Sequence, residues 1–133
     1  MSDHIIIIGA SHAGVAVATE LRALDARVAI TLISDEPAAP YQRPPLSKAY
    51  MSGAMSLDRL ALRAPDWFSD HAIDLRLATS ASALDPFGKS VTLHTGETLP
   101  YTKLVLATGA QARTLPDTIG GTLGNVHVMR TLA

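Results

Sequence analysis

Gly9 and Gly14 bracket a short segment whose residue types suit the binding of a pyrophosphate group. The first glycine allows a tight turn out of a strand, and the second allows the following helix to pack closely on a sheet. The N-terminus of such a helix presents unpaired N–H groups and a positive dipole end to phosphate oxygens. We therefore expect Gly9, Ser11, His12, Ala13 and Gly14 to lie at a dinucleotide-binding turn.

Ser11 departs from the G-x-G-x-x-G pattern, which has its second glycine at this position. That glycine lets the backbone approach the pyrophosphate, so a Cβ atom here crowds the ligand. Backbone strain at such a site costs about 1–3 kcal/mol, which corresponds to roughly one to two decades of affinity. Alternatively, the serine hydroxyl donates a hydrogen bond to a phosphate oxygen. We expect binding to be weakened and not abolished.

Two adjacent acids, Asp35 and Glu36, follow a second apolar run over 28–33. Asp35 lies 21 residues after Gly14, close to the place where dinucleotide-binding sequences have an acid that accepts hydrogen bonds from a ribose. Glu36 is the alternative ribose partner. In a third interpretation, Asp35 only caps or solvates the loop. We favour Asp35 as the ribose ligand.

The loop after these acids is stiff and carries two cations. Its prolines remove backbone donors and fix φ, so residues 37–48 cannot form a central strand. We expect an extended loop that ends in a short helix over 46–51. This loop would place Arg43 and Lys48 near the end of the second strand, where α/β folds bind ligands. The alternative is an ordinary connector.

Apolar periodicity predicts the elements that must position these residues. The four isoleucines at 5–8 suit a parallel strand buried on both faces. Val17, Leu21 and Leu24 form a stripe at helical spacing, which predicts a helix over 13–24. Further strands are expected over 28–33, 73–78, 90–94 and 98–101. Residues 104–110 are expected to form a strand that runs into another glycine turn, and residues 64–71 a further helix.

Two of these regions carry more detail. Trp67 and Phe68 are expected to anchor the later helix in the core. The strands over 90–94 and 98–101 read as a hairpin, and the strand that begins at Leu104 reads as buried. The predicted fold is α/β, with a Rossmann-type core and a small β-hairpin layer.

Composition excludes several classes of function. The 133 residues are 47% hydrophobic and 17% charged, with a net charge of −1, which fits one globular domain without a nucleic-acid surface. The chain has no cysteine, so it holds no redox-active disulfide, thiolate nucleophile or cysteine metal ligand. The histidines form no metal-binding pair. No run approaches the roughly 20 apolar residues that span a membrane, and the expected location is the cytoplasm.

Several motifs occur together in this chain: Gly9 to Gly14, Asp35-Glu36, Tyr-Gln-Arg-Pro-Pro-Leu-Ser-Lys over 41–48, Leu-Val-Leu-Ala-Thr-Gly-Ala over 104–110, and Arg-Thr-Leu over 130–132. Together they resemble the N-terminal FAD-binding part of the ferredoxin-reductase flavoproteins, of the putidaredoxin, rubredoxin and dioxygenase reductase type. The resemblance runs through essentially the whole chain. It implies an oxidoreductase that takes hydride from NADH or NADPH onto FAD and passes electrons singly to a small iron–sulfur protein of ferredoxin or rubredoxin type.

The resemblance also implies roles for particular residues. Ala13 and its turn would contact the FAD pyrophosphate, and Asp35, helped by Glu36, the adenosine ribose. Arg43 and Lys48 would approach the phosphates or the flavin ring. The remaining implied FAD contacts are Ala81 through its backbone, Thr108 and Gly109 in the turn after the later strand, and Arg130. A solvated side chain is the alternative for Lys48 and for Arg130.

By the same resemblance, residues 1–133 form one partial FAD-binding domain, without the NADH domain and the C-terminal interface domain of the family. We therefore expect an exposed apolar patch over the FAD cleft, and with it self-association or a complementing chain. A second hypothesis is a non-catalytic dinucleotide-binding module, or a truncated remnant without turnover. A simple NAD-dependent dehydrogenase is disfavoured, since no Tyr-x-x-x-Lys pair follows the first βα unit.

Replacing Ser11 by glycine tests the crowding argument. Ser11→Gly should tighten dinucleotide binding by roughly ten- to a hundredfold, because the substitution removes the strain that a Cβ imposes beside a pyrophosphate. Calorimetric titration of the original chain and of the variant measures the change. Unchanged or weaker binding in the variant would show that the Cβ does not crowd the ligand.

Overall fold

The computed structural model describes residues 2–132 and builds them around a parallel sheet. Its strands pair in the order β3-β2-β1-β7, with parallel pairing throughout. The strands are β1 (His4–Ile8), β2 (Ala29–Ile33), β3 (Ile73–Arg76) and β7 (Lys103–Leu106), and helix α1 (His12–Leu24) connects β1 to β2. The predicted Rossmann-type core is confirmed, and its strands and first helix lie within a few residues of the expected bounds.

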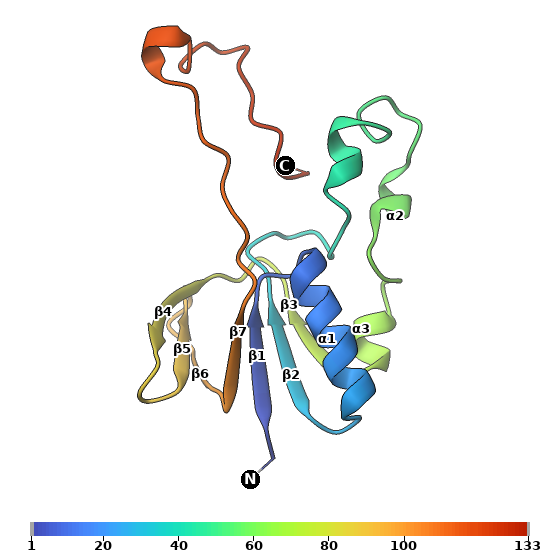
Figure 1. Cartoon of the computed structure of the whole chain (residues 1–133), viewed down its shortest axis with the longest axis vertical. Coiled ribbons are helices and arrows are strands. Elements are labelled where there is room, and N and C mark those ends of the chain that lie inside the picture. The colour runs from blue at the N-terminus through green and yellow to red at the C-terminus, as the bar shows by residue number, and fades with distance from the viewer. Residues whose placement is uncertain (1, 133) are drawn as a thin grey trace.

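A smaller antiparallel sheet forms a second layer against the parallel sheet (Figure 1). It contains β4 (Ala81–Asp85), β5 (Ser90–Leu93) and β6 (Thr98–Pro100), in that order. The predicted hairpin is confirmed as β5 and β6, and Gly96 in its turn has a φ of +88°, which favours glycine. Strand β4 was missed, because its alanines and serine have little β propensity and it forms through pairing with β5.

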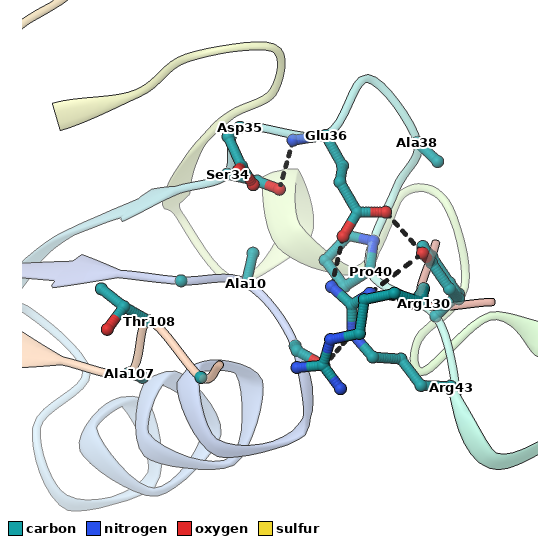
Figure 2. Close-up of a pocket in the computed structure, with 14 residues that line it drawn as sticks. Ala10, Ser34, Asp35, Glu36, Ala38, Pro40, Arg43, Ala107, Thr108 and Arg130 are labelled. Atoms are coloured by element: carbon teal, nitrogen blue, oxygen red, sulfur yellow. Dashed lines mark hydrogen bonds and ion pairs between the residues drawn. The ribbon is translucent and has the colours of Figure 1, made fainter. Parts of the chain in front are cut away.

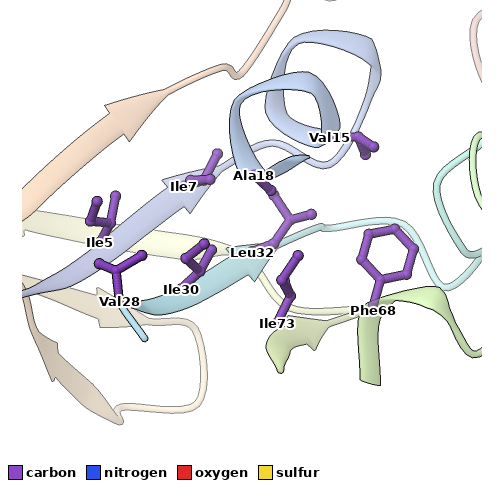
Figure 3. Packing of buried hydrophobic residues seen from close by; sticks show 9 residues of the cluster. All are labelled: Ile5, Ile7, Val15, Ala18, Val28, Ile30, Leu32, Phe68 and Ile73. Atoms are coloured by element: carbon purple, nitrogen blue, oxygen red, sulfur yellow. The ribbon is translucent and has the colours of Figure 1, made fainter. Parts of the chain in front are cut away.

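Alternate residues of β1 face opposite layers. Ile5 and Ile7 pack with α1, β2 and Phe68 (Figure 3). Ile6 packs on the other face with Ile33 and with side chains of the antiparallel sheet. A strand enclosed in this way must be apolar at every position, which accounts for the run of isoleucines.

Short helical turns occupy the connection between β2 and β3. They are η1 (Pro44–Ser47), α2 (Leu57–Leu60) and α3 (Trp67–Asp70). The helix expected over 46–51 is wrong: a 3-10 turn begins at Pro44, since proline suits the first positions of a helix, and the backbone leaves helical geometry at Lys48. The helix expected over 64–71 is confirmed only as α3, and α2 was missed. No helix within residues 2–132 is long and apolar enough to cross a membrane.

The apolar stripe of α1 is only partly confirmed. Val17 and Leu21 are partly buried, but Leu24 is 84% exposed. The buried face of α1 is centred on Val15 and Ala18, and at 100° per residue Leu24 points about 150° away from the centre of that face. The expected anchors of α3 are confirmed, with Phe68 buried and Trp67 partly buried against the same core.

Residues 107–132 leave β7 as an extended arm that contains η2 (Asp117–Ile119) and turns back toward the segment 41–60 (Figure 1). Leu106, at the base of the arm, is 61% exposed. The expectation that β7 is buried throughout is therefore wrong, because β7 lies at the edge of the sheet. Large exposed apolar side chains continue along the arm: Leu115, Ile119, Leu123, Val126, Val128 and Met129.

Replacing Gly14 by alanine tests how closely α1 must pack on the turn after β1. A Cβ atom at Gly14 would overlap the carbonyl group of Gly9. We expect Gly14→Ala to lower the free energy of unfolding by about 1–3 kcal/mol, as overpacking does, measured by urea denaturation.

Gly124→Ala is the matched control, since nothing lies within 4 Å of a Cβ added at Gly124. The control should leave the urea midpoint of the chain almost unchanged. Equal midpoints for Gly14→Ala and the original chain would contradict the close approach of α1.

Candidate dinucleotide-binding site

The carboxyl ends of β1, β2 and β7 meet at one edge of the parallel sheet. The chain passes from β1 to β2 on one side of β1 and returns as β7 on its other side. The strand order therefore reverses beside β1. In open α/β sheets, ligands bind in the crevice outside such a reversal.

Gly9 makes the turn that opens this edge. Its φ of +108° favours glycine, and its N–H donates to the carbonyl oxygen of Ile33 at 2.9 Å. A Cβ atom at Gly9 would overlap the carbonyl group of Ala107. The turns after β1 and β7 therefore touch, and only glycine fits between them.

Two adjoining pockets follow this edge of the sheet. One runs from the glycine turn to the proline-rich loop (Figure 2). The other extends toward the start of β4 and is lined in part by Thr79, Ser80 and Ala81. Gly9, Asp35 and Thr108 line both. We call the two pockets together the crevice.

The predicted site residues divide into two sets. Those that line the crevice are Gly9, Ser11, Asp35, Glu36, Arg43, Ala81, Thr108, Gly109 and Arg130. His12, Ala13, Gly14 and Lys48 do not line it. His12 and Ala13 are exposed in the first turn of α1, and Gly14 is buried. The Lys48 ammonium donates to the carbonyl oxygen of Pro44 at 3.3 Å.

The two adjacent acids have different partners. Within residues 2–132, the Asp35 carboxylate has no hydrogen bond or ion pair. The Glu36 carboxylate accepts a hydrogen bond from the Tyr41 hydroxyl and forms an ion pair with Arg43. Asp35 is therefore the acid whose oxygens are open to the hydroxyl groups of a ligand.

The Arg43 guanidinium joins segments that are far apart in the sequence. Its Nε donates to Ser11 Oγ at 3.3 Å, and its Nη1 donates to the carbonyl oxygen of Arg130 at 2.7 Å. Its Nη2 pairs with Glu36, and Figure 2 shows these two side chains pointing toward each other. The guanidinium also lies 5.3 Å from the centroid of the Tyr41 ring.

Tyr41 is a crevice residue that the sequence-based prediction missed. Burial raises the pKa of its phenol, and the hydrogen bond to Glu36 raises that pKa further. The hydroxyl therefore remains a proton donor at neutral pH. The sequence offers one signal for Tyr41 as a site residue. It lies two residues before Arg43, and a buried tyrosine hydroxyl needs a polar partner.

The residues of the crevice fit a dinucleotide. Ser11 is the N-cap residue of α1 but makes no side-chain cap, and the first turn of α1 has no acidic residue. The positive end of the helix dipole is thus available to a phosphate group. The open carboxylate of Asp35 suits ribose hydroxyls. The close approach of Gly9 to the turn after β7 keeps these groups at one edge.

Comparison with known proteins agrees with this geometry. The model of the family "Pyridine nucleotide-disulphide oxidoreductase" matches residues 3–133. The chain is 42% identical over 127 residues to rhodocoxin reductase of Rhodococcus erythropolis, which covers 96% of this chain and 30% of that protein. It is 39% identical over 133 residues to putidaredoxin reductase of Pseudomonas putida, which covers 98% of this chain and 32% of that protein.

Solved structures give the same result. A covalent putidaredoxin reductase–putidaredoxin complex matches with a TM-score of 0.83 and 40% identity, over 86% of this chain and 27% of that chain. NADH:rubredoxin oxidoreductase from Clostridium acetobutylicum matches with a TM-score of 0.77 and 34% identity, over 87% of this chain and 30% of that chain. The chain thus spans about a third of the length of the relatives that it matches. With the family model matched over residues 3–133, the chain belongs to the pyridine nucleotide-disulphide oxidoreductase family.

Proposed function

We propose that this chain is the FAD-binding part of an NAD(P)H-dependent reductase of the ferredoxin or rubredoxin type. The observation that carries the proposal is the pairing of an open acid, Asp35, with the glycine turn at Gly9 on one edge of the sheet. This pairing is the one that a dinucleotide requires. The similarity to reductases over nearly the whole chain supports the same assignment.

The proposed contacts follow the crevice. The N–H groups at the start of α1 would face the pyrophosphate, and Asp35 would accept hydrogen bonds from the adenosine ribose. Thr79, Ser80 and Ala81 line the pocket on the far side of Asp35, where the adenine would lie. Arg130 lines the crevice beside Gly109, where its charge would favour a phosphate.

The chemistry of the whole reductase would come from its flavin, which accepts hydride from a nicotinamide and gives up electrons singly. The residues of this chain would bind and orient FAD. The proposed reductant is NADH, and the proposed acceptor is a small iron–sulfur protein in the cytoplasm. Two relatives support this choice of reaction partners: rubredoxin-NAD(+) reductase of Pseudomonas putida, and the putidaredoxin reductase that was crystallised in covalent complex with putidaredoxin.

The Asp35 carboxylate is the residue to test first. Asp35→Asn should weaken FAD binding by roughly ten- to a hundredfold, because a hydrogen bond to a charged acceptor contributes about 1.5–3 kcal/mol. Flavin fluorescence during titration of the chain measures the dissociation constant. Asp117→Asn, in the exposed arm, is the matched control and should leave the dissociation constant unchanged. A dissociation constant for Asp35→Asn equal to that of the original chain would show that Asp35 does not bind the ribose.

The crevice should also prefer one half of the dinucleotide. Asp35 and the glycine turn would hold the adenosine diphosphate half, so ADP should displace FAD from the chain whereas FMN at the same concentration should not. Flavin fluorescence reports displacement by ADP, and equilibrium dialysis reports competition by FMN. Displacement by FMN as effective as that by ADP would place the flavin half in the crevice.

A further inference from the structure

We propose that Glu36 is a positioning residue and not a ribose ligand: its carboxylate holds Tyr41 and Arg43 in the orientation that fastens residues 130–132 over the crevice. The effect of Glu36 on ligand binding rests on the proposed dinucleotide function. Its effect on the position of residues 130–132 in the ligand-free chain does not.

Both oxygens of the Glu36 carboxylate are engaged. Oε2 accepts a hydrogen bond from the Tyr41 hydroxyl, and Oε1 pairs with Arg43 Nη2. The side chains of this ion pair are only 17% exposed for Glu36 and 24% for Arg43. A ribose that bound Glu36 would therefore have to displace a shielded, charge-assisted contact. The neighbouring Asp35 carboxylate offers the same chemistry at no such cost.

Glu36 also sets the direction of the hydrogen bonds around it. A tyrosine hydroxyl has one proton to donate, and an arginine has donors but no acceptor. Because Tyr41 gives its proton to Glu36, its oxygen is left to accept hydrogen bonds. It accepts one from the Leu132 backbone N–H at 3.1 Å and one from Arg43 Nη1 at 3.4 Å. The Glu36 carboxylate can only accept, so it fixes the direction in which Tyr41 and Arg43 donate.

The same two side chains fasten the end of the arm. Arg43 Nη1 donates to the Arg130 carbonyl oxygen at 2.7 Å, and Tyr41 accepts from the Leu132 N–H. The Leu132 side chain packs against the cluster formed by Tyr41, Leu46 and Leu60. Residues 130–132 are thus held against the segment 41–60 by hydrogen bonds between side chains of the proline-rich loop and the backbone of the arm, and by the apolar contact of Leu132.

Farther along, the arm supports itself only locally. The backbone hydrogen bonds of residues 116–126 join partners within that same segment. Its large apolar side chains are exposed. The fastening at 130–132 therefore decides where the arm returns to the body of the molecule, and it places Arg130 on the wall of the crevice.

Hydrogen exchange in the ligand-free chain tests this arrangement directly. Glu36→Ala should raise the exchange rate of the Leu132 amide by roughly tenfold, which corresponds to one lost hydrogen bond. Glu36→Gln should show a smaller increase, because its amide oxygen still accepts one hydrogen bond. Glu97→Gln is the matched control: Glu97 forms an ion pair with Arg76 outside the crevice, and its loss should not alter exchange at Leu132. An unchanged Leu132 amide in Glu36→Ala would overturn the proposal.

The amides of β1 show whether Glu36→Ala is still folded. If these amides also lose protection, Tyr41→Phe decides, because it removes the acceptor of the Leu132 N–H and leaves the ion pair of Glu36 with Arg43 in place. Faster exchange at Leu132 with a protected β1 supports the fastening, and unchanged exchange overturns it.

A ligand-binding measurement then separates the two roles of Glu36. We expect Glu36→Ala to raise the dissociation rate of FAD about tenfold in stopped-flow fluorescence, in parallel with the exchange at Leu132. If Glu36 were instead a ribose ligand, Glu36→Ala would weaken ADP binding without altering exchange at Leu132 in the ligand-free chain. That pair of results would overturn the proposal. If the original chain binds no FAD, the proposed function fails while the exchange result still decides the role of Glu36.

Discussion

The close contact between the turns after β1 and β7 is the constraint on which the crevice depends. Gly9 lies against the carbonyl group of Ala107, and Gly14 lies against that of Gly9. Three segments can meet at one point because neither glycine carries a Cβ atom. A wider gap would move the N–H groups of α1 away from Asp35, and the two kinds of group that a dinucleotide needs would no longer share one edge.

The central elements of the fold could be predicted because their signals are local. The isoleucines of β1 indicate burial on both faces, and the two layers found there bear this out. The glycines and the acid pair, each placed after a predicted strand, together predict the edge at which the crevice lies. Such signals depend on a residue and its near neighbours in sequence, so they can be recognised without knowledge of the tertiary structure.

Other features depend on contacts between distant segments and were missed or wrong. The exposure of Leu24 follows from which side of α1 meets the sheet, and a stripe of apolar residues does not reveal that. Strand β4 exists through its pairing with β5. The role of Tyr41 depends on Leu132, which lies 91 residues away in the sequence. No local pattern in the chain encodes such a distance.

The partners of the two arginines change how the charge of the crevice is understood. The family resemblance implies that Arg43 approaches the phosphates or the flavin ring. In the structure its charge is compensated by Glu36, and its other donors hold Ser11 and the Arg130 carbonyl group. The Arg130 side chain forms no ion pair within residues 2–132 and lies close to Gly109. On the proposed function, attraction of an anion would therefore fall to Arg130 and to the N-terminus of α1, whereas Arg43 would keep Arg130 in place.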